Sequence, residues 1–567
     1  MYLEAGRDTA VRKSELSPSK HHLRRVGGAV VTTLAAVLVF LALAMPDQIT
    51  RLPPGNPVVN ALVRIPIEAL VAIAVLLAVP ERARRIIATV LGAALGLLTV
   101  LKIVDIGFFA VLAREFDPVL DWVLFNDGYH FLQDSIGDIG ALAVAAAAIL
   151  LTAGLIISLT LSTRRLTRLL AAHAGPARHA VFAFSSAWIV LAVLGVQIVG
   201  GVPVAAQSAA ELARDTALKV PQDIADQKAF DREVQVDAFR NLPDDQLLTA
   251  LRGKDVIIGF VESYGRDAVE NPEFNGQVLD QLKADDGKLA AAGFASRTGF
   301  LTSSTLGGGS WLAHATFLSG LWIDNQQRYR SLVATDRLTL TSAFKRAGFR
   351  TVGVEPGVTF AWPEGQFYGY DQVWDSHKLD YHGPALSWST MPDQYVMSQF
   401  QKLEYGKAQR RPLMAEVTLT SSHTPWAPLP TTLDWDKLGD GSVYGPIVKN
   451  AETASSVWKD NRKIRQAYAT SVAYSVDTLT SYVQRYADDN LVMIMLGDHQ
   501  PNTVVVGQNS SRDVPVSIIA KDPKVLDRIN SWGWTDGLTP AATAPVWPMS
   551  QFRDRFLTAY SPDGEPH

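Results

Sequence analysis

Five long apolar segments, all before residue 205, constrain the fold of this chain more than any other feature of its sequence. They cover residues 28–45, 58–80, 86–112, 139–162 and 180–204. Each approaches or exceeds the ~17–25 residues that a helix needs to cross a bilayer. Because a backbone in lipid must satisfy its own hydrogen bonds, these segments predict a five-helix transmembrane domain over residues 28–204.

A polar and basic segment, residues 1–27, precedes the first apolar run. Such a flank also begins a secretory signal peptide. The apolar segments recur, however, and no small-residue cleavage site closes the first of them. The sequence therefore favours an uncleaved first span with a basic N-terminal segment before it.

The charges of the connections predict which way the spans run. Arginines are concentrated at 81–85 and 163–179, whereas the connection 113–138 has Arg114 against six acidic residues. By the positive-inside rule, the N-terminus and the two arginine-rich connections face the cytoplasm. Five spans then place everything after residue 205 outside a multi-pass protein of the plasma membrane.

The pattern changes after the last apolar segment. Residues 205–250 are charged and mixed, and they predict a helical connector next to the membrane. From 251 to 567, short apolar runs alternate with helical stretches. The expected strands are 255–261, 350–355, 413–419, 491–496 and 514–520. This alternation predicts an α/β domain with a mostly parallel central sheet.

Composition excludes several functions. The chain has no cysteine, so it has neither disulfides nor thiolate chemistry. Its formal charge of −4 over 567 residues gives no reason to expect a nucleic-acid partner.

Polar side chains follow several of the expected strands directly. Glu262 ends the first one, His423 follows the strand 413–419, and Asp498 and His499 follow the strand 491–496. Open α/β sheets place their chemistry at the carboxyl ends of the strands. Each signal is weak alone, because a turn after a buried strand also favours polar residues.

A glycine-rich loop, Gly307 to Gly309, precedes Ser310 and a stretch of helical character. A hydroxyl at the start of a helix lies beside free N–H groups, which favour an alkoxide or a phosphate. A simple N-cap serine is the alternative interpretation. Ser303, Ser304 and Thr305 offer other hydroxyls close by.

Taken together, these residues resemble a known family. Glu262, Ser310 after its glycine loop, His423 in Ser-Ser-His-Thr-Pro and Gly497-Asp498-His499 resemble the sulfatase-like branch of the alkaline phosphatase superfamily. Five spans before an external domain are similar to the layout of lipoteichoic acid synthases and related phosphoglycerol transferases. The resemblance implies an alkaline-phosphatase-like catalytic domain over residues 251–567.

The resemblance also implies roles for individual residues. Glu262, Asp498 and His499 become metal ligands, and Ser310 becomes both a ligand and the catalytic nucleophile. His423 becomes a catalytic residue that contacts the substrate phosphate. Its own position after a strand also suits it to protonate a leaving alkoxide or to bind a second metal. The implied cofactor is a divalent cation, with Mn²⁺ favoured and Zn²⁺ or Mg²⁺ as alternatives.

Three departures from the family pattern limit what it implies. The synthases usually have threonine as nucleophile, whereas Ser310 stands here. Trp362 is a partial counterpart of a substrate-binding Trp and Arg pair, but the arginine is missing, which leaves glycerol phosphate specificity open. The residues after Ser310 lack the Pro and Arg of true sulfatases, which disfavours sulfate ester hydrolysis.

The resulting hypothesis is a membrane-anchored, metal-dependent phosphotransferase. It moves a phosphoglycerol-like headgroup from a phospholipid donor to an envelope glycan, lipid or polymer through phospho-Ser310. A phosphodiesterase, phosphatase or sulfuric-ester hydrolase of the same superfamily is the first alternative, because water can attack the same intermediate. A non-catalytic envelope-assembly protein is the second. The oligomeric state is left open by the sequence.

Overall fold

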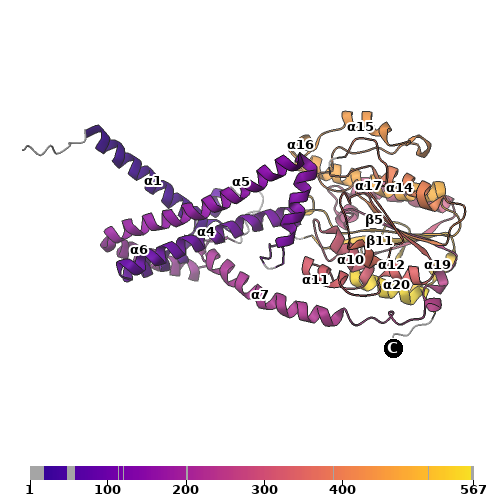
Figure 1. Cartoon of the computed structure of the whole chain (residues 1–567), viewed down its shortest axis with the longest axis horizontal. Helices are drawn as coiled ribbons and strands as arrows, with labels where there is room; N and C mark the ends of the chain where they lie inside the picture. Colours follow the sequence, from indigo (N-terminus) through magenta and orange to yellow (C-terminus); the bar gives the residue numbers. More distant parts are fainter. Residues whose placement is uncertain are drawn as a thin grey trace, which may run out of the picture. The chain divides into compact units, whose positions relative to one another are not determined.

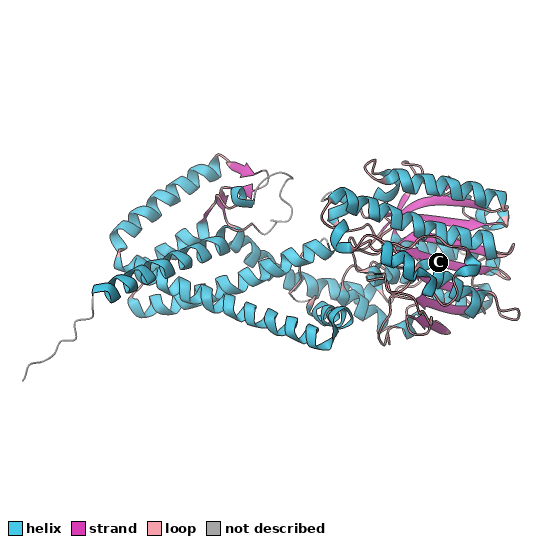
Figure 2. Cartoon of the chain, turned by 90° about the horizontal axis from the view of Figure 1, so that it is seen from above, coloured by secondary structure: helices cyan, strands magenta, loops and turns pink. Residues whose placement is uncertain are grey.

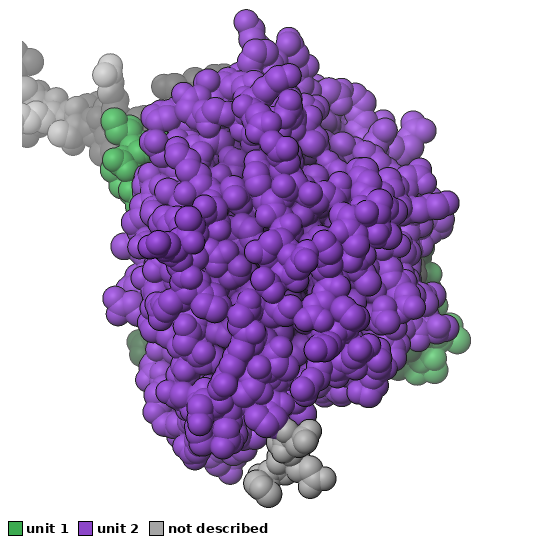
Figure 3. Space-filling view, turned by 90° about the vertical axis from the view of Figure 1, so that its right-hand side faces the viewer, with its two compact units in different colours: residues 1–107, 124–219 green, residues 108–123, 220–567 purple. Residues whose placement is uncertain are grey.

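The structure is a computed structural model that describes residues 18–46, 58–112, 114–118, 120–199, 202–386, 388–507 and 510–562. Its contacts divide the chain into two compact units, shown in two colours in Figure 3. The first unit comprises Met1–Gly107 and Leu124–Lys219, and the second comprises Phe108–Val123 and Val220–His567. Residues 1–17, most of the N-terminal segment predicted to be cytoplasmic, lie outside the described residues.

Long helices make up most of the first unit, and its strands are short (Figures 1 and 2). The helices are α1 (Pro18–Ala44), α2 (Val58–Ala61), α3 (Ile67–Ala78), α4 (Glu81–Leu112), α5 (Trp122–Ala172) and α6 (Ala174–Val193). In the described part of the chain, 4 helices are long and apolar enough to cross a membrane: α1, α4, α5 and α6. The apolar helix α3 is shorter, at 12 residues.

The boundaries of the spans differ from the prediction in several places. The predicted span 58–80 is helical only over Val58–Ala61 and Ile67–Ala78. The connections predicted at 81–85 and 163–179 are largely helical, because α4 begins at Glu81 and α5 continues to Ala172. Arginine is a good helix former, so charge alone did not end these helices. The last predicted span, 180–204, is helical only to Val193. After it come the strands β2 (Gln197–Val199), β3 (Val202–Pro203) and β4 (Ala205–Ala206); β4 pairs with β1 (Ile65–Pro66).

The predicted connector forms one long helix, α7 (Ser208–Glu233), which continues through Pro221. Short 3-10 turns at Asp244–Gln246 and Thr249–Leu251 lead into the sheet.

The second unit contains a nine-stranded mixed sheet with the order β12-β6-β11-β10-β5-β9-β7-β8, in which β13 also pairs with β6. Its strands are β5 (Asp255–Val261), β6 (Ala295–Thr302), β7 (Arg350–Glu355), β8 (Gln372–Asp375), β9 (Leu413–Leu419), β10 (Leu491–Gly497), β11 (Asp513–Ala520), β12 (Thr535–Asp536) and β13 (Val546–Pro548). The central run from β10 through β5, β9 and β7 to β8 is parallel. The five predicted strands are present, and the sheet is mostly parallel at its centre as expected.

Helices cover both faces of this sheet (Figure 1). The helices that follow β5 are α8 (Asp267–Glu270), α9 (Asn275–Ala291), α10 (Ser310–Ser319), α11 (Gln326–Val333), α12 (Leu340–Arg346), α13 (Gly365–Tyr368), α14 (Asp393–Phe400), α15 (Gly445–Asn450), α16 (Ala454–Val457), α17 (Asn461–Tyr486), α18 (Thr503–Val506), α19 (Pro523–Asp527) and α20 (Phe552–Tyr560). Successive β5 residues enter two separate cores: Ile258 packs with α10, α12 and α20, while Ile257 packs with α9, α14 and α17. This two-sided burial explains why β5 is a continuous apolar run.

Candidate active site

The strand register brings the predicted site residues to one edge of the sheet. Gly497 of β10 pairs with Val261 of β5, and Val261 pairs with Leu419 of β9, all in parallel. The residues that follow these partners leave the sheet at the same level. Glu262 and Asp498 are therefore neighbours although they are far apart in the sequence.

Four of the predicted side chains meet at this edge. The Oγ of Ser310 donates a hydrogen bond to Glu262 Oε2 at 2.9 Å and lies 3.2 Å from His499 Nε2. His499 Nε2 is also 3.3 Å from Glu262 Oε1 and 3.6 Å from Asp498 Oδ2. Glu262, Asp498 and His499 are almost completely buried. The structure thus joins a hydroxyl, two carboxylates and an imidazole in one cluster.

The glycine-rich loop positions Ser310 at the start of α10. Gly309 precedes the helix with φ 81° and ψ 36°, a left-handed conformation that favours glycine. The N–H of Gly307 donates to the carbonyl of Gln500 at 2.9 Å. The loop is therefore tied to the segment that contains His499, and the Ser310 hydroxyl is held toward it.

Gly497 lets the end of β10 approach the turn after β5. A Cβ atom on Gly497 would lie 1.9 Å from the carbonyl oxygen of Tyr264, which leaves no room for any larger residue. Next to it, Asp498 Oδ1 accepts hydrogen bonds from the N–H groups of Ser263 and His499, both at 2.7 Å. Among the described residues, Asp498 Oδ2 is buried without a hydrogen-bond partner.

His499 is held in the tautomer that a metal ligand needs. Its Nδ1 lies 2.8 Å from the carbonyl oxygen of Gln500, so Nδ1 carries the proton and donates it. In the neutral ring that a metal ligand requires, Nε2 is then the atom with the lone pair, and it faces the carboxylates. A backbone carbonyl that fixes the second ring nitrogen is the usual support for a ligating histidine.

The pKa values in this cluster reflect two carboxylates buried side by side. Burial and the charge of Glu262 raise the pKa of Asp498 to about 7. Burial opposes charge on His499, but the charge of Asp498 and the hydrogen bond to Glu262 raise its pKa to about 9. Burial likewise opposes ionisation of Glu262, yet His499 holds the pKa of Glu262 well below its usual range. The cluster therefore favours a bound positive charge.

A divalent cation fits this set of side chains. Glu262, Asp498 and His499 each offer one ligand atom, and these atoms all lie within 4.8 Å of one another. The unpartnered Asp498 Oδ2 is a buried oxygen that a cation would satisfy. Two carboxylate oxygens and one imidazole nitrogen suit a borderline or hard metal. These three residues could thus hold the ion.

The other candidate hydroxyls lie elsewhere. Ser303 Oγ is buried and donates to the backbone carbonyl of Asp498 at 2.6 Å. Ser304 Oγ lies 2.9 Å from Thr316 Oγ1, and Thr305 Oγ1 is buried without a partner among the described residues. Ser310 is the hydroxyl that contacts both Glu262 and His499.

His423 lies in the loop after β9. Its Nδ1 donates to the carbonyl of Thr424 at 2.5 Å, and its ring stacks on Trp388 with centroids 3.8 Å apart. Burial lowers the pKa of His423, although the charge of Glu262 opposes this. In the neutral form Nε2 accepts hydrogen bonds, so donating to a phosphate or a leaving group requires the protonated ring.

The loop of His423 is anchored by an aspartate that the sequence did not single out. Asp393 Oδ1 accepts from the N–H of Ser421 at 2.9 Å, and its Oδ2 accepts from Ser475 Oγ at 2.6 Å. Asp393 is the first residue of α14. An acidic residue in a first helical turn is common, so its sequence position gave no signal of this role.

A second buried polar cluster lies next to the first. His314, one turn after Ser310, places Nδ1 3.2 Å from Glu416 Oε1. Glu355 Oε2 at the end of β7 accepts from Thr418 Oγ1 at 2.9 Å. Burial and the charge of Glu416 raise the pKa of Glu355 to about 8. Glu416, a lone acid inside the apolar run of β9, was the sequence signal for this cluster.

Trp362 belongs to an aromatic group rather than to the four-residue cluster. Its ring centroid lies 5.7 Å from that of Tyr368 and 6.4 Å from that of Tyr370. The Tyr370 hydroxyl in turn donates to Glu416. Trp362 is thus linked to the second polar cluster, and its contact with substrate stays a prediction.

Comparison with known proteins agrees with this geometry. Residues 250–516 match the family model described as Sulfatase. The class that the fold, the site and the family model indicate is therefore a sulfatase-like enzyme. More particularly, residues 250–516 are similar to the Sulfatase family, as the sequence motifs predicted, in a chain that also has helices long and apolar enough to cross a membrane.

Several solved structures are similar to part of the chain. The lipoteichoic acid synthase LtaP from Listeria monocytogenes is 15% identical, with 60% of this chain and 79% of that one covered at a TM-score of 0.37. The phosphoglycerol transferase GacH from Streptococcus pyogenes, in complex with sn-glycerol-1-phosphate, is 13% identical, with 60% and 86% covered at 0.35. The soluble domain of lipooligosaccharide phosphoethanolamine transferase A from Neisseria meningitidis is 13% identical, with 58% and 96% covered at 0.36.

No curated protein matches the chain.

Proposed function

We propose that this protein is a metal-dependent phosphotransferase that moves a phosphoglycerol-like headgroup from a membrane phospholipid to an acceptor of the cell envelope. The observation that supports this most directly is the position of Ser310. Its Oγ lies 2.9 Å from Glu262 Oε2 and 3.2 Å from His499 Nε2, beside a buried donor set for a cation. A serine at this place can act as a covalent nucleophile.

In the proposed reaction, the bond from Ser310 Oγ to phosphorus forms as the bond from phosphorus to the diacylglycerol oxygen breaks. An acceptor hydroxyl then attacks phospho-Ser310, which restores the serine. A divalent cation held by Glu262, Asp498 and His499, with Ser310 as a fourth ligand, would lower the hydroxyl pKa and offset charge on the phosphoryl group. Mn²⁺ is our proposed ion. The free N–H groups at the start of α10 would orient the phosphate.

His423 is the proposed contact for the substrate phosphate. Its Nδ1–H is already donated to Thr424, so Nε2 is the atom left for substrate. A phosphate anion beside the ring would raise the pKa of His423 and favour the protonated form that donates. Trp362 is proposed to contact the headgroup.

The membrane domain has a role in this proposal. With the predicted span 58–80, of which α3 is the main helical part, counted as the fifth, the proposed topology places the N-terminus in the cytoplasm and the catalytic domain outside. Fixing the enzyme in the bilayer that contains its donor raises the donor's effective concentration.

The test uses the full-length protein in detergent, with Mn²⁺ and phosphatidylglycerol. We expect diacylglycerol release and a phosphorylated peptide containing Ser310 in the mass spectrum. Ser310→Ala should lose both, whereas Ser310→Thr should retain a phosphorylated hydroxyl. Undiminished diacylglycerol release by Ser310→Ala would refute the nucleophile.

The same assay separates the alternatives. A phosphodiesterase or phosphatase would release free headgroup at the same rate with or without an envelope glycan, because water is its acceptor. A sulfuric-ester hydrolase would cleave an aryl sulfate faster than the phospholipid. A non-catalytic assembly protein would show neither a bound metal nor a phosphorylated peptide.

A further inference from the structure

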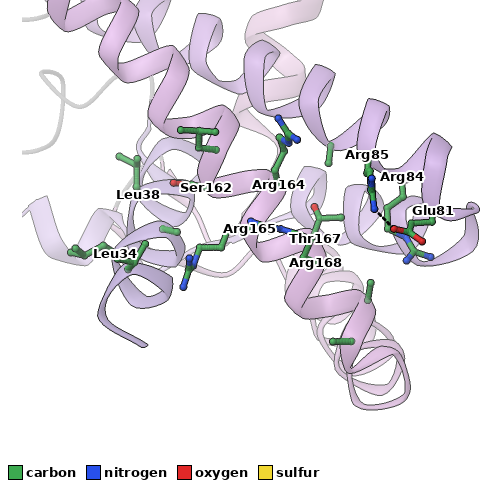
Figure 4. Close-up of a pocket in the computed structure, with 16 residues that line it drawn as sticks. Leu34, Leu38, Glu81, Arg84, Arg85, Ser162, Arg164, Arg165, Thr167 and Arg168 are labelled. Carbon is green, nitrogen blue, oxygen red and sulfur yellow. Dashed lines mark hydrogen bonds and ion pairs between the residues drawn. The ribbon is translucent and has the colours of Figure 1, made fainter. Parts of the chain in front are cut away.

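A pocket with a volume of about 940 Å³ lies within the first unit, between α1, α4 and α5 (Figure 4). Its lining comprises Val31, Leu34, Ala35, Leu38, Glu81, Arg84, Arg85, Ala88, Leu161, Ser162, Arg164, Arg165, Thr167, Arg168, Ala171 and Ala172. The volume falls within the range of ~300–1,000 Å³ typical of ligand sites. None of these residues belongs to the catalytic unit.

The lining has an apolar side and a basic side. The residues from α1 are all aliphatic, while α4 and α5 supply five arginines and the single acid Glu81. Five arginines less one glutamate leave a formal charge of +4 around the pocket. A site of this sign is suited to an anion, and its aliphatic wall is suited to a hydrocarbon chain.

Three of the arginines are engaged with the protein and build the walls. Arg84 donates to the carbonyls of Leu76 and Val79 at 2.8 and 3.0 Å, which joins α4 to the end of α3. Arg165 donates to Thr32 Oγ1 at 2.9 Å and to the carbonyl of Gly28 at 2.7 Å, which joins α5 to α1. Arg85 pairs with Glu81.

Arg164 and Arg168 differ from these three arginines in their contacts. They lie four residues apart on α5, so they share one face of that helix. Within the described ranges of the chain, neither makes a hydrogen bond or an ion pair, and both are exposed. Their positive charges are thus available to a ligand.

We propose that this pocket binds one anionic phospholipid, with its phosphate between Arg164 and Arg168 and an acyl chain along Leu34 and Leu38. The ends of α4 and α5 that carry the arginines lie at one end of apolar spans, where a lipid of the adjacent leaflet reaches them. Basic pockets between transmembrane helices are known to hold anionic headgroups. A small soluble anion would leave the aliphatic wall without a partner.

The experiment uses the full-length protein, purified in detergent and depleted of lipid. Its melting temperature is measured during titration with phosphatidylglycerol, phosphatidylcholine or soluble glycerol phosphate. We expect the melting temperature to rise to a plateau with phosphatidylglycerol and to stay unchanged with phosphatidylcholine or glycerol phosphate. Arg164→Gln with Arg168→Gln should weaken the apparent affinity about 30-fold, the effect expected for two arginines near an anionic lipid.

The matched control is Arg82→Gln with Arg178→Gln. These two arginines are also exposed, on α4 and α6, and neither lines the pocket. The control removes the same charge and should keep the wild-type affinity. An equal loss in the control would overturn the proposal in favour of general attraction to the basic face. An equal rise with glycerol phosphate would overturn it in favour of a soluble anion.

If the double variant does not fold, the single variants Arg164→Gln and Arg168→Gln are compared by native mass spectrometry. Each should retain fewer bound phosphatidylglycerol molecules than Arg82→Gln. Equal lipid counts in all three would contradict the proposal. All titrations are done with a chelator and on a Ser310→Ala background, so turnover and metal-dependent substrate binding do not contribute. The lipid site and the catalytic proposal therefore fail or hold separately.

Discussion

The Oγ of Ser310 donates a hydrogen bond of 2.9 Å to Glu262 Oε2, across 48 positions of sequence. Ser310 begins a helix and Glu262 directly follows a strand, so the contact fixes the start of α10 against the carboxyl edge of the sheet. The same Oγ is 3.2 Å from His499 Nε2. A hydroxyl that contacts two candidate metal ligands at once is positioned for chemistry rather than for a simple helix cap.

Replacing Ser310 should separate catalysis from metal binding. Ser310→Ala is expected to lower kcat at least about a thousandfold, as the loss of a nucleophile does in other covalent enzymes. Bound metal per protein should change little, because Glu262, Asp498 and His499 remain. Atomic absorption beside the rate assay checks both. Loss of the metal together with the activity would show that Ser310 is mainly a ligand.

Asp498→Asn should abolish stabilisation by metal. The wild-type protein should gain about 2.7 kcal/mol when the cation is present at 100 times its Kd. The variant lacks the buried carboxylate oxygen that has no hydrogen-bond partner in the described part of the chain, so its melting temperature should not respond to Mn²⁺. With a chelator present, the variant should be at least as stable as the wild type. A metal-dependent rise in the variant would place the ion elsewhere.

Gly497→Ala should destabilise the catalytic domain by about 1–3 kcal/mol, the usual range for overpacking. The added Cβ would lie 1.9 Å from the carbonyl oxygen of Tyr264, and backbone atoms there cannot move aside easily. Gly287→Ala in α9 is the control, because a Cβ there has no atom within 4 Å. The control should stabilise by about 0.5–1 kcal/mol. Thermal unfolding of both variants measures the difference.

The buried carboxyl group of Asp393 should make the stability of the folded protein depend on pH. Burial raises its pKa from 3.8 to about 6 in the folded protein. The folded state therefore binds more protons than the unfolded state between these two values, and stability falls as the pH rises from about 4 to about 6. The contribution is about 3 kcal/mol at most. This stabilisation is fully present below pH 3.8, the pKa of Asp393 in the unfolded chain, and it is lost above about pH 6, its pKa in the folded protein.

Asp393→Asn removes this titration. The difference in melting temperature between wild type and variant should shift in favour of the variant as the pH rises from 4 to 7. Asp436→Asn is a control, because its exposed side chain has no comparable burial. A constant difference across this range would mean that the hydrogen bonds from Ser421 and Ser475 already offset the charge of Asp393.

The strands of the sheet were predictable where burial is two-sided. The runs at 255–261, 350–355 and 413–419 coincide with β5, β7 and β9, because buried parallel strands are apolar on both faces. β6 (Ala295–Thr302) was not predicted. Its sequence begins Ala-Ser-Arg-Thr-Gly, and these polar residues are accommodated by pairing with β11, β12 and β13.

In the first unit, the sequence predicted the helical spans but not where the last one ends. Hydropathy located the four long spans, but it also extended the last one over β2 (Gln197–Val199) and β3 (Val202–Pro203). The strand that follows directly, β4, is held by pairing of Ala205 with Ile65. Such long-range pairing leaves no local signature, so hydropathy extended the span beyond its helix.

By itself, the sequence determined the apolar spans, the alternation of strands and helices, and which polar residues follow each strand. It also identified Glu262, Ser310, Asp498 and His499 as candidates. Only the tertiary structure decided that Ser310, rather than Ser303, Ser304 or Thr305, contacts Glu262 and His499. The physical reason is that local pattern sets the form of each element, whereas strand register and the close approach at Gly497 set which side chains meet.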